Sequence, residues 1–177
     1  MNQPDKEPTA LRYLEHATAA NEAAKMILRL DERCATAVEA KISIGLSLQA
    51  AELAGKGMLR ALGTPAADIR RNHRNQNLLE LLSAVEARLE AHENGAVRLY
   101  GRFMDWRPII DGREFRQTVR EYFADHFARG KNAFPRNYFY PDMETFAGPV
   151  PIQAIYIMVQ KIIECADNVA AANPSGR

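Results

Sequence analysis

Apolar residues return every three or four positions through most of the chain, which is the spacing of a helix with one buried face. The spacing predicts a first helix over about residues 9–30 and a second over about residues 34–62. The second has two apolar stripes, which indicates a central and largely buried position. A third helix is expected over about residues 77–91, and the most regular repeat predicts a last helix over residues 152–169.

The stretch before the last helix has a different composition. Of the 14 aromatic residues in the chain, 12 lie between Tyr100 and Phe146. One more helix is predicted here, from Arg113 to about Ala128, and the rest is expected to be ordered loop because linkers are rarely so aromatic. The sequence therefore predicts an all-α fold, a compact bundle of four to five helices with an aromatic and basic insertion at about residues 95–131.

The length of 177 residues suits one domain, expected over residues 8–171 and followed by a disordered tail at 172–177. No apolar run is long enough to span a membrane, and the first residues lack the pattern of a signal peptide, so we expect a cytoplasmic protein. Cys34 and Cys165 lack the spacing of a disulfide framework or a zinc site. We expect both to be buried, and we expect no metal and no cofactor.

Candidate chemistry is concentrated in the aromatic stretch, because the chain has no phosphate loop, dinucleotide fingerprint, nucleophile elbow or HExxH helix. Nine cations and five acids lie among aromatic residues between Arg98 and Arg136. This mixture suits RNA binding, in which arginines contact phosphates and rings stack on bases. The alternative is that the rings form core and the arginines pair with the acids. The residues assigned here to nucleic-acid binding are Arg113, Arg116 and Arg136.

Arg120 and His126 are the candidate catalytic residues, with five residues between them. In metal-free RNA cleavage, a histidine can move the 2′-hydroxyl proton while an arginine stabilises the charge that develops on the phosphate. On a straight helix, six positions amount to about 600° of rotation and leave the side chains about 120° apart. The pair would therefore have to lie at a helix end or act across a dimer.

A basic turn before the third helix is a further candidate for nucleic-acid binding. It contains Arg70, Arg71, His73 and Arg74, and the backbone amides at the start of a helix already favour an anion. The alternative is an ordinary solvated turn.

Three segments together resemble the HEPN superfamily (higher eukaryotes and prokaryotes nucleotide-binding domains). Residues 47–63, SLQAAELAGKGMLRALG, are similar to the family's alanine-rich helix with a lysine-bearing end and a Leu-Gly stop. Residues 72–82, NHRNQNLLELL, resemble its histidine loop and leucine-rich helix, and residues 136–142, RNYFYPD, resemble its Arg-Tyr-Pro-Asp lead-in to the last helix. The segment AAELAGKG is also similar to the AbiV-like abortive-infection branch.

The resemblance implies a helical bundle that binds or cleaves RNA in host defence or toxin–antitoxin systems, often as a homodimer with its site across the two-fold axis. Catalytic members carry an Arg-x(4–6)-His motif close to the start of the last helix. Here no histidine follows Arg136, and Arg120 and His126 match that spacing further upstream. Either the site has moved with the insertion, or the chain is catalytically inactive.

Two functions remain open from the sequence. The first is RNA binding or cleavage, by a metal-independent endoribonuclease mechanism if the chain is active. The second is a catalytically inactive module that dimerises or binds a protein partner such as a nucleotidyltransferase. The position of His126 discriminates between them, because a catalytic pair has to face one cleft and a histidine buried among core aromatics favours the second function.

Overall fold

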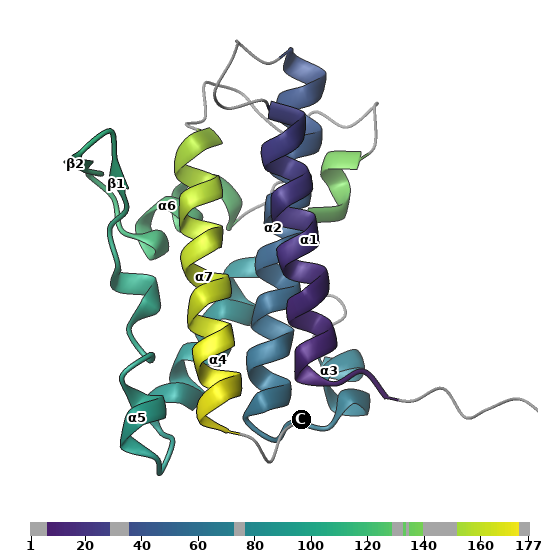
Figure 1. Ribbon diagram of the computed structural model, residues 1–177, viewed down its shortest axis with the longest axis vertical. Coiled ribbons are helices and arrows are strands. Elements are labelled where there is room, and N and C mark those ends of the chain that lie inside the picture. The colour runs from purple at the N-terminus through teal and green to yellow at the C-terminus, as the bar shows by residue number, and fades with distance from the viewer. Residues whose placement is uncertain are drawn as a thin grey trace, which may run out of the picture.

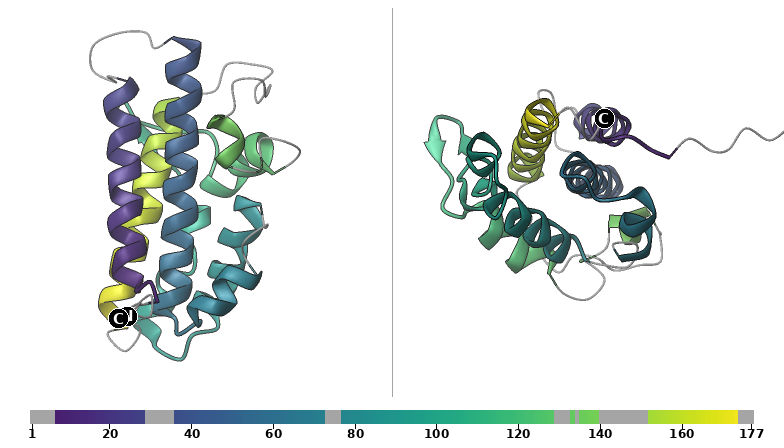
Figure 2. Two further views of the ribbon diagram at one scale, coloured as in Figure 1. Left: turned by 90° about the vertical axis from the view of Figure 1, so that its right-hand side faces the viewer. Right: turned by 90° about the horizontal axis from the view of Figure 1, so that it is seen from below.

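Three long helices run side by side along the molecule: α1 (Ala10–Leu28), α2 (Ala37–Ala61) and α7 (Ile152–Ala172) (Figure 1 and Figure 2). α2 lies at the centre and packs against both of the others. One predicted stripe of α2 is buried, including Ile44 and Leu48, whereas in the other Ala50 is buried and the remaining residues are half-buried. The computed structural model describes residues 7–28, 36–72, 77–128, 133, 135–139 and 152–173.

The start of α2 is fixed by a reciprocal cap. The Thr36 hydroxyl accepts a hydrogen bond from the backbone N–H of Glu39, and the Glu39 carboxylate accepts one from the backbone N–H of Thr36. The two bonds satisfy amides that the first turn of a helix leaves without partners. α2 therefore begins at Ala37, three residues after the predicted start.

Two glycines of α2 allow neighbouring elements to approach its backbone. A Cβ atom built on Gly57 would lie 2.9 Å from Cδ2 of Leu14 on α1. A Cβ atom on Gly45 would lie 2.7 Å from Cβ of Tyr138, on the short 3-10 helix η3 (Pro135–Phe139). Both distances are shorter than real Cβ contacts. At Gly45 a larger residue would push η3 away from α2, whereas at Gly57 the end of the Leu14 side chain could move aside.

Shorter helices cover the remaining side of α2 (Figure 2). They are α3 (Ala66–Asn72) and α4 (Leu78–Glu90), whereas α5 (Gly95–Arg98) contacts α4 and α7. α4 begins after Asn77, whose side chain accepts a hydrogen bond from the backbone N–H of Glu80, as expected for a helix cap. The predicted basic turn is corrected in part, since Arg70 and Arg71 belong to α3; His73 and Arg74 lie outside the described residues.

The helix predicted from Arg113 begins later, and this prediction is corrected. α6 spans Val119–Phe127, and residues before it form a two-stranded antiparallel hairpin of β1 (Ile109–Ile110) and β2 (Arg113–Glu114). The turn contains Asp111 and Gly112 with φ of 50° and 74°, the backbone that a two-residue hairpin requires. Thr118 then caps α6 by accepting a hydrogen bond from the backbone N–H of Glu121.

The aromatic stretch supplies core as well as surface. Tyr122, Phe123, Phe127 and Tyr138 are completely or almost completely buried, with neighbouring rings in edge-on or tilted contacts. η1 (Phe103–Asp105) joins this layer to α4 and α7. The core therefore extends from the three long helices into the predicted insertion. For these four rings, the alternative expectation that the aromatic residues form core is the correct one.

The predicted all-α fold is confirmed, with the small hairpin as the one addition among the described residues. Cys165 is buried as expected, whereas Cys34 lies outside the described residues. Within the part of the chain that the structure describes, no helix combines the length and apolar character needed to cross a bilayer.

Candidate functional site

Arg120 joins three elements of the aromatic layer. Its Nη2 atom donates a hydrogen bond to the Glu86 carboxylate on α4, and its Nε atom lies 3.4 Å from Oδ1 of Asp105 in η1. Glu86 is only 7% exposed. The hydrogen bond with Glu86 is the main cause that raises the pKa of Arg120, so the side chain stays cationic. The guanidinium group serves as the counter-charge of a buried carboxylate.

His126 lies at the other end of α6 and is half-buried. Its ring centroid is 4.6 Å from that of Tyr122 and 6.1 Å from that of Phe127, with tilted planes. α6 is a regular α-helix at both positions, so the side chains of Arg120 and His126 keep their expected angular separation. No hydrogen bond, ion pair or ring contact joins these two residues, and the described neighbours of each are different.

Arg113 and Arg116 are brought together by the hairpin. They line one surface cavity of about 360 Å³, together with Ile110, the acidic residue Glu114, Phe115, and Gln153 and Ala154 from the first turn of α7. Both arginines are exposed, and neither guanidinium group forms an ion pair or hydrogen bond with another described residue. Two cations beside an aromatic ring are the combination that the sequence suggested for RNA.

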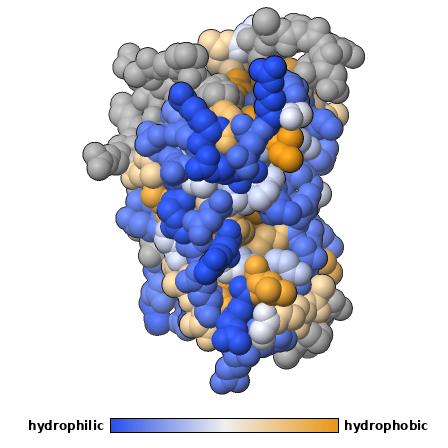
Figure 3. All heavy atoms as spheres, turned by 90° about the vertical axis from the view of Figure 1, so that its left-hand side faces the viewer, coloured by the Kyte–Doolittle hydropathy of each residue, from blue (hydrophilic) through white to orange (hydrophobic). Residues whose placement is uncertain are grey.

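The segment from α5 to the hairpin forms one edge of the molecule (Figure 1). Seen from this edge, hydrophilic side chains gather over the hairpin end and continue toward α5, with separate hydrophobic spots between them (Figure 3). Arg98 and Arg102 belong to this segment, are exposed and have no partner among the described residues. Arg107 differs, because it lies 3.9 Å from the Glu121 carboxylate and donates a hydrogen bond to the carbonyl oxygen of Arg116.

The other residues assigned to nucleic-acid binding lie elsewhere. Arg136 is exposed on η3, which sits on the opposite side of the bundle from the hairpin (Figure 1). Arg70 lies 3.7 Å from a Glu7 carboxylate oxygen, and Arg71 lies 2.8 Å from one of Asp68. Of the predicted set, the structure therefore groups Arg113 and Arg116 and separates them from Arg136, Arg70 and Arg71.

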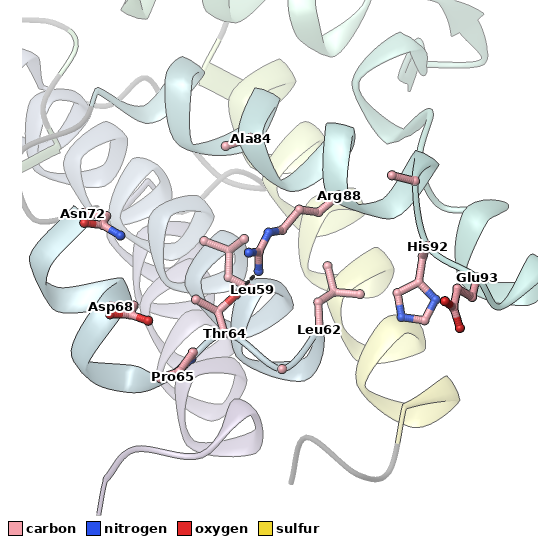
Figure 4. Close-up of a pocket in the computed structure, with 12 residues that line it drawn as sticks. Leu59, Leu62, Thr64, Pro65, Asp68, Asn72, Ala84, Arg88, His92 and Glu93 are labelled. Carbon is pink, nitrogen blue, oxygen red and sulfur yellow. Dashed lines mark hydrogen bonds between the residues drawn. The ribbon is translucent and has the colours of Figure 1, made fainter.

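A larger cavity, of about 560 Å³, lies at the other end of the bundle from the hairpin (Figure 1 and Figure 4). The turn between α2 and α3, α3 itself and the end of α4 form its walls. Its polar lining includes Thr64, Asp68, Arg88, His92 and Glu93. Sequence reasoning missed this cavity because its side chains come from separate elements and form no motif.

Comparison with known proteins finds no matching family, no matching curated protein and no matching solved structure. The resemblance to the HEPN superfamily therefore stays a prediction. Among the described residues, no group of three or more histidine, cysteine, aspartate or glutamate side chains is arranged to hold a metal ion.

Proposed function

We propose that this chain is a HEPN-like module that binds single-stranded RNA through an arginine edge, defined as Arg98, Arg102, Arg113 and Arg116. The observation that carries the proposal is that all four side chains are exposed and lack an acidic partner among the described residues. An unpaired guanidinium group offers several donors in one plane, which suits phosphate oxygens. Phe115, between Arg113 and Arg116 in the same cavity lining, is half-buried, with its ring edge-on to Tyr122 at 5.8 Å between centroids, so only its outer part can contact a base.

Binding without cleavage is the form of this function that the geometry favours. Arg120 is held by Glu86 and Asp105, so its charge already has two acidic partners. His126 is half-buried against Tyr122 and Phe127 and, in the part of the chain that the structure describes, does not share a cleft with Arg120, an outcome that counts against cleavage and toward the partner-binding alternative. Because a catalytic pair has to converge on one phosphate, these separate surroundings favour an inactive arrangement within one chain. A homodimer that completes the pair, and a role in defence or toxin–antitoxin systems, remain predictions.

A second candidate is a catalytically inactive module that binds a protein partner, such as a nucleotidyltransferase. The observation that favours it is on the same edge, where Leu99 is 82% exposed and Ile109 is 64% exposed. Exposed apolar residues beside arginines are a common composition of protein interfaces.

RNA binding is tested by fluorescence anisotropy with a labelled uridine oligonucleotide and the full chain. Arg113→Gln with Arg116→Gln is expected to weaken binding about tenfold or more, because each hydrogen bond to a charged phosphate contributes to affinity. The matched control is Arg70→Gln with Arg71→Gln, which removes two exposed but ion-paired arginines and should leave affinity unchanged. No binding by the unmodified chain would reject RNA and leave the protein-partner module.

A further inference from the structure

The cavity at the α3 end of the bundle has the size of a small-molecule site. Its volume of about 560 Å³ falls within the range of about 300–1,000 Å³ that is usual for such sites. Leu59, Leu62 and Pro65 provide an apolar part of the lining. None of the four residues of the arginine edge lines this cavity.

Arg88 is the arginine in the described lining of this cavity; its side chain is exposed and has no acidic partner among the described residues. It reaches from α4 toward the turn after α2, where its Nη1 atom donates a hydrogen bond to the hydroxyl of Thr64 (Figure 4). This is the one partner of its guanidinium group among the described residues. In contrast, Arg71 and Arg120 pair with carboxylates. Arg88 therefore keeps N–H donors without a partner among the described residues, in a cavity whose lining also contains the carboxylates of Asp68 and Glu93.

Thr64, which accepts the hydrogen bond from Arg88, is itself held in place. The residue is 7% exposed, and its backbone carbonyl oxygen accepts a hydrogen bond of 3.3 Å from Nη1 of Arg60. Its backbone N–H donates to the carbonyl oxygen of Leu59 at 2.9 Å. Because Thr64 is held at both backbone groups, the hydrogen bond to its hydroxyl orients the Arg88 side chain before any ligand arrives.

The charges of the lining define the ligand class. A guanidinium group suits a carboxylate or a phosphate. Asp68 and Glu93 also line the cavity, so an anion with two charges would be repelled more strongly than one with a single charge. The described part of the lining contains no phenylalanine, tyrosine or tryptophan, and its apolar side chains are aliphatic. Leu62 and Pro65 present apolar surface here, whereas Leu59 is 1% exposed and lies behind them. We propose that this cavity binds a small aliphatic monocarboxylate, with its carboxylate on Arg88 and its hydrocarbon part on Leu62 and Pro65.

Titration of the full chain with butyrate, followed by amide chemical shifts, tests the proposal. Saturable shifts at millimolar butyrate are expected at the α2–α3 turn and at the end of α4. Arg88→Gln should weaken binding about tenfold, because the charged hydrogen-bond donor is lost. Arg88→Lys keeps the charge and should retain part of the affinity. Arg12→Gln is the matched control, since it removes an exposed arginine of α1 that lines no part of this cavity, and it should bind as the unmodified chain does.

Three results would overturn the proposal. Shifts that do not saturate would show that butyrate has no site here. Equal shifts with 1-butanol would show that the carboxylate is not recognised. Tighter binding of inorganic phosphate at the same residues would reject the monocarboxylate assignment. Equal melting temperatures of the Arg88 and Arg12 variants exclude unfolding as the cause of a lost response.

Discussion

Arg120 of α6 donates a hydrogen bond to Glu86 of α4, a carboxylate that is almost completely buried. The second oxygen of that carboxylate, Oε1, is buried without a hydrogen-bond partner among the described residues. The negative charge of the buried Glu86 carboxylate is therefore balanced by the guanidinium group of Arg120. The residue that the sequence suggested as catalytic has a clear structural role.

Arg120→Ala is expected to lower the free energy of unfolding by about 1–3 kcal/mol, because it leaves the Glu86 carboxylate buried without its cation. Arg113→Ala is the control and should change stability little, since Arg113 is exposed and unpaired. Chemical denaturation measures both. If Arg120→Ala proved as stable as Arg113→Ala, the ion pair would contribute nothing to the fold.

His126→Ala tests whether the chain cleaves RNA. We expect no cleavage by the unmodified chain and unchanged RNA affinity in the variant, because His126 contacts Tyr122 and lies outside the arginine edge. Gel analysis of a labelled RNA in the presence of a chelator provides the measurement. Cleavage that is present in the unmodified chain and lost in His126→Ala would contradict the inactive arrangement and restore the catalytic hypothesis.

Gly45→Ala tests the close approach of η3 to α2. The new Cβ atom would lie 2.7 Å from Cβ of Tyr138, so η3 has to shift, at an expected cost of about 1–3 kcal/mol. Gly95→Ala in α5 is the control, because its nearest described atom lies 3.9 Å away. Thermal unfolding of the two variants should therefore differ, and equal midpoints would show that η3 does not rest on α2.

Cys165 is expected to resist alkylation at neutral pH. Burial raises the pKa of its thiol to about 12, so the reactive thiolate is scarce in the folded chain. Because the pKa is raised in the folded state, the contribution of this thiol to the free energy of unfolding is present below its unfolded pKa. That contribution is lost as pH rises from the unfolded pKa through the folded pKa. Iodoacetamide labelling of a Cys34→Ser variant, with and without denaturant, measures the protection. Rapid labelling of the folded chain would contradict the burial of Cys165.

Most of the fold could be predicted because it depends on local pattern. The apolar repeat located α1, α2, α4 and α7 to within a few residues of their bounds. The prediction failed at the start of α6, where Arg113 and Glu114 were assigned to a helix and form a strand. The dipeptide Asp111-Gly112 carries the turn signal that could have corrected this boundary.

The sites were harder to predict because their parts are distant in sequence. Glu86 lies 34 positions before Arg120, and nothing in the sequence near either residue marks them as a pair. Thr64 and Arg88 are 24 positions apart. Arg113 and Arg116 were proposed from composition alone, and the hairpin and the first turn of α7 define the cavity that they share. Such groupings follow from tertiary packing, which a single sequence does not specify.

The salt dependence of RNA affinity tests the central claim most directly. A plot of log affinity against log salt concentration should be steep for the unmodified chain, since each phosphate contact with single-stranded RNA contributes a slope of about −0.7. Arg113→Gln with Arg116→Gln should reduce the magnitude of the slope by about 1.4, the sum for two lost contacts. Equal slopes for the unmodified chain and this double variant would contradict RNA binding through the arginine edge.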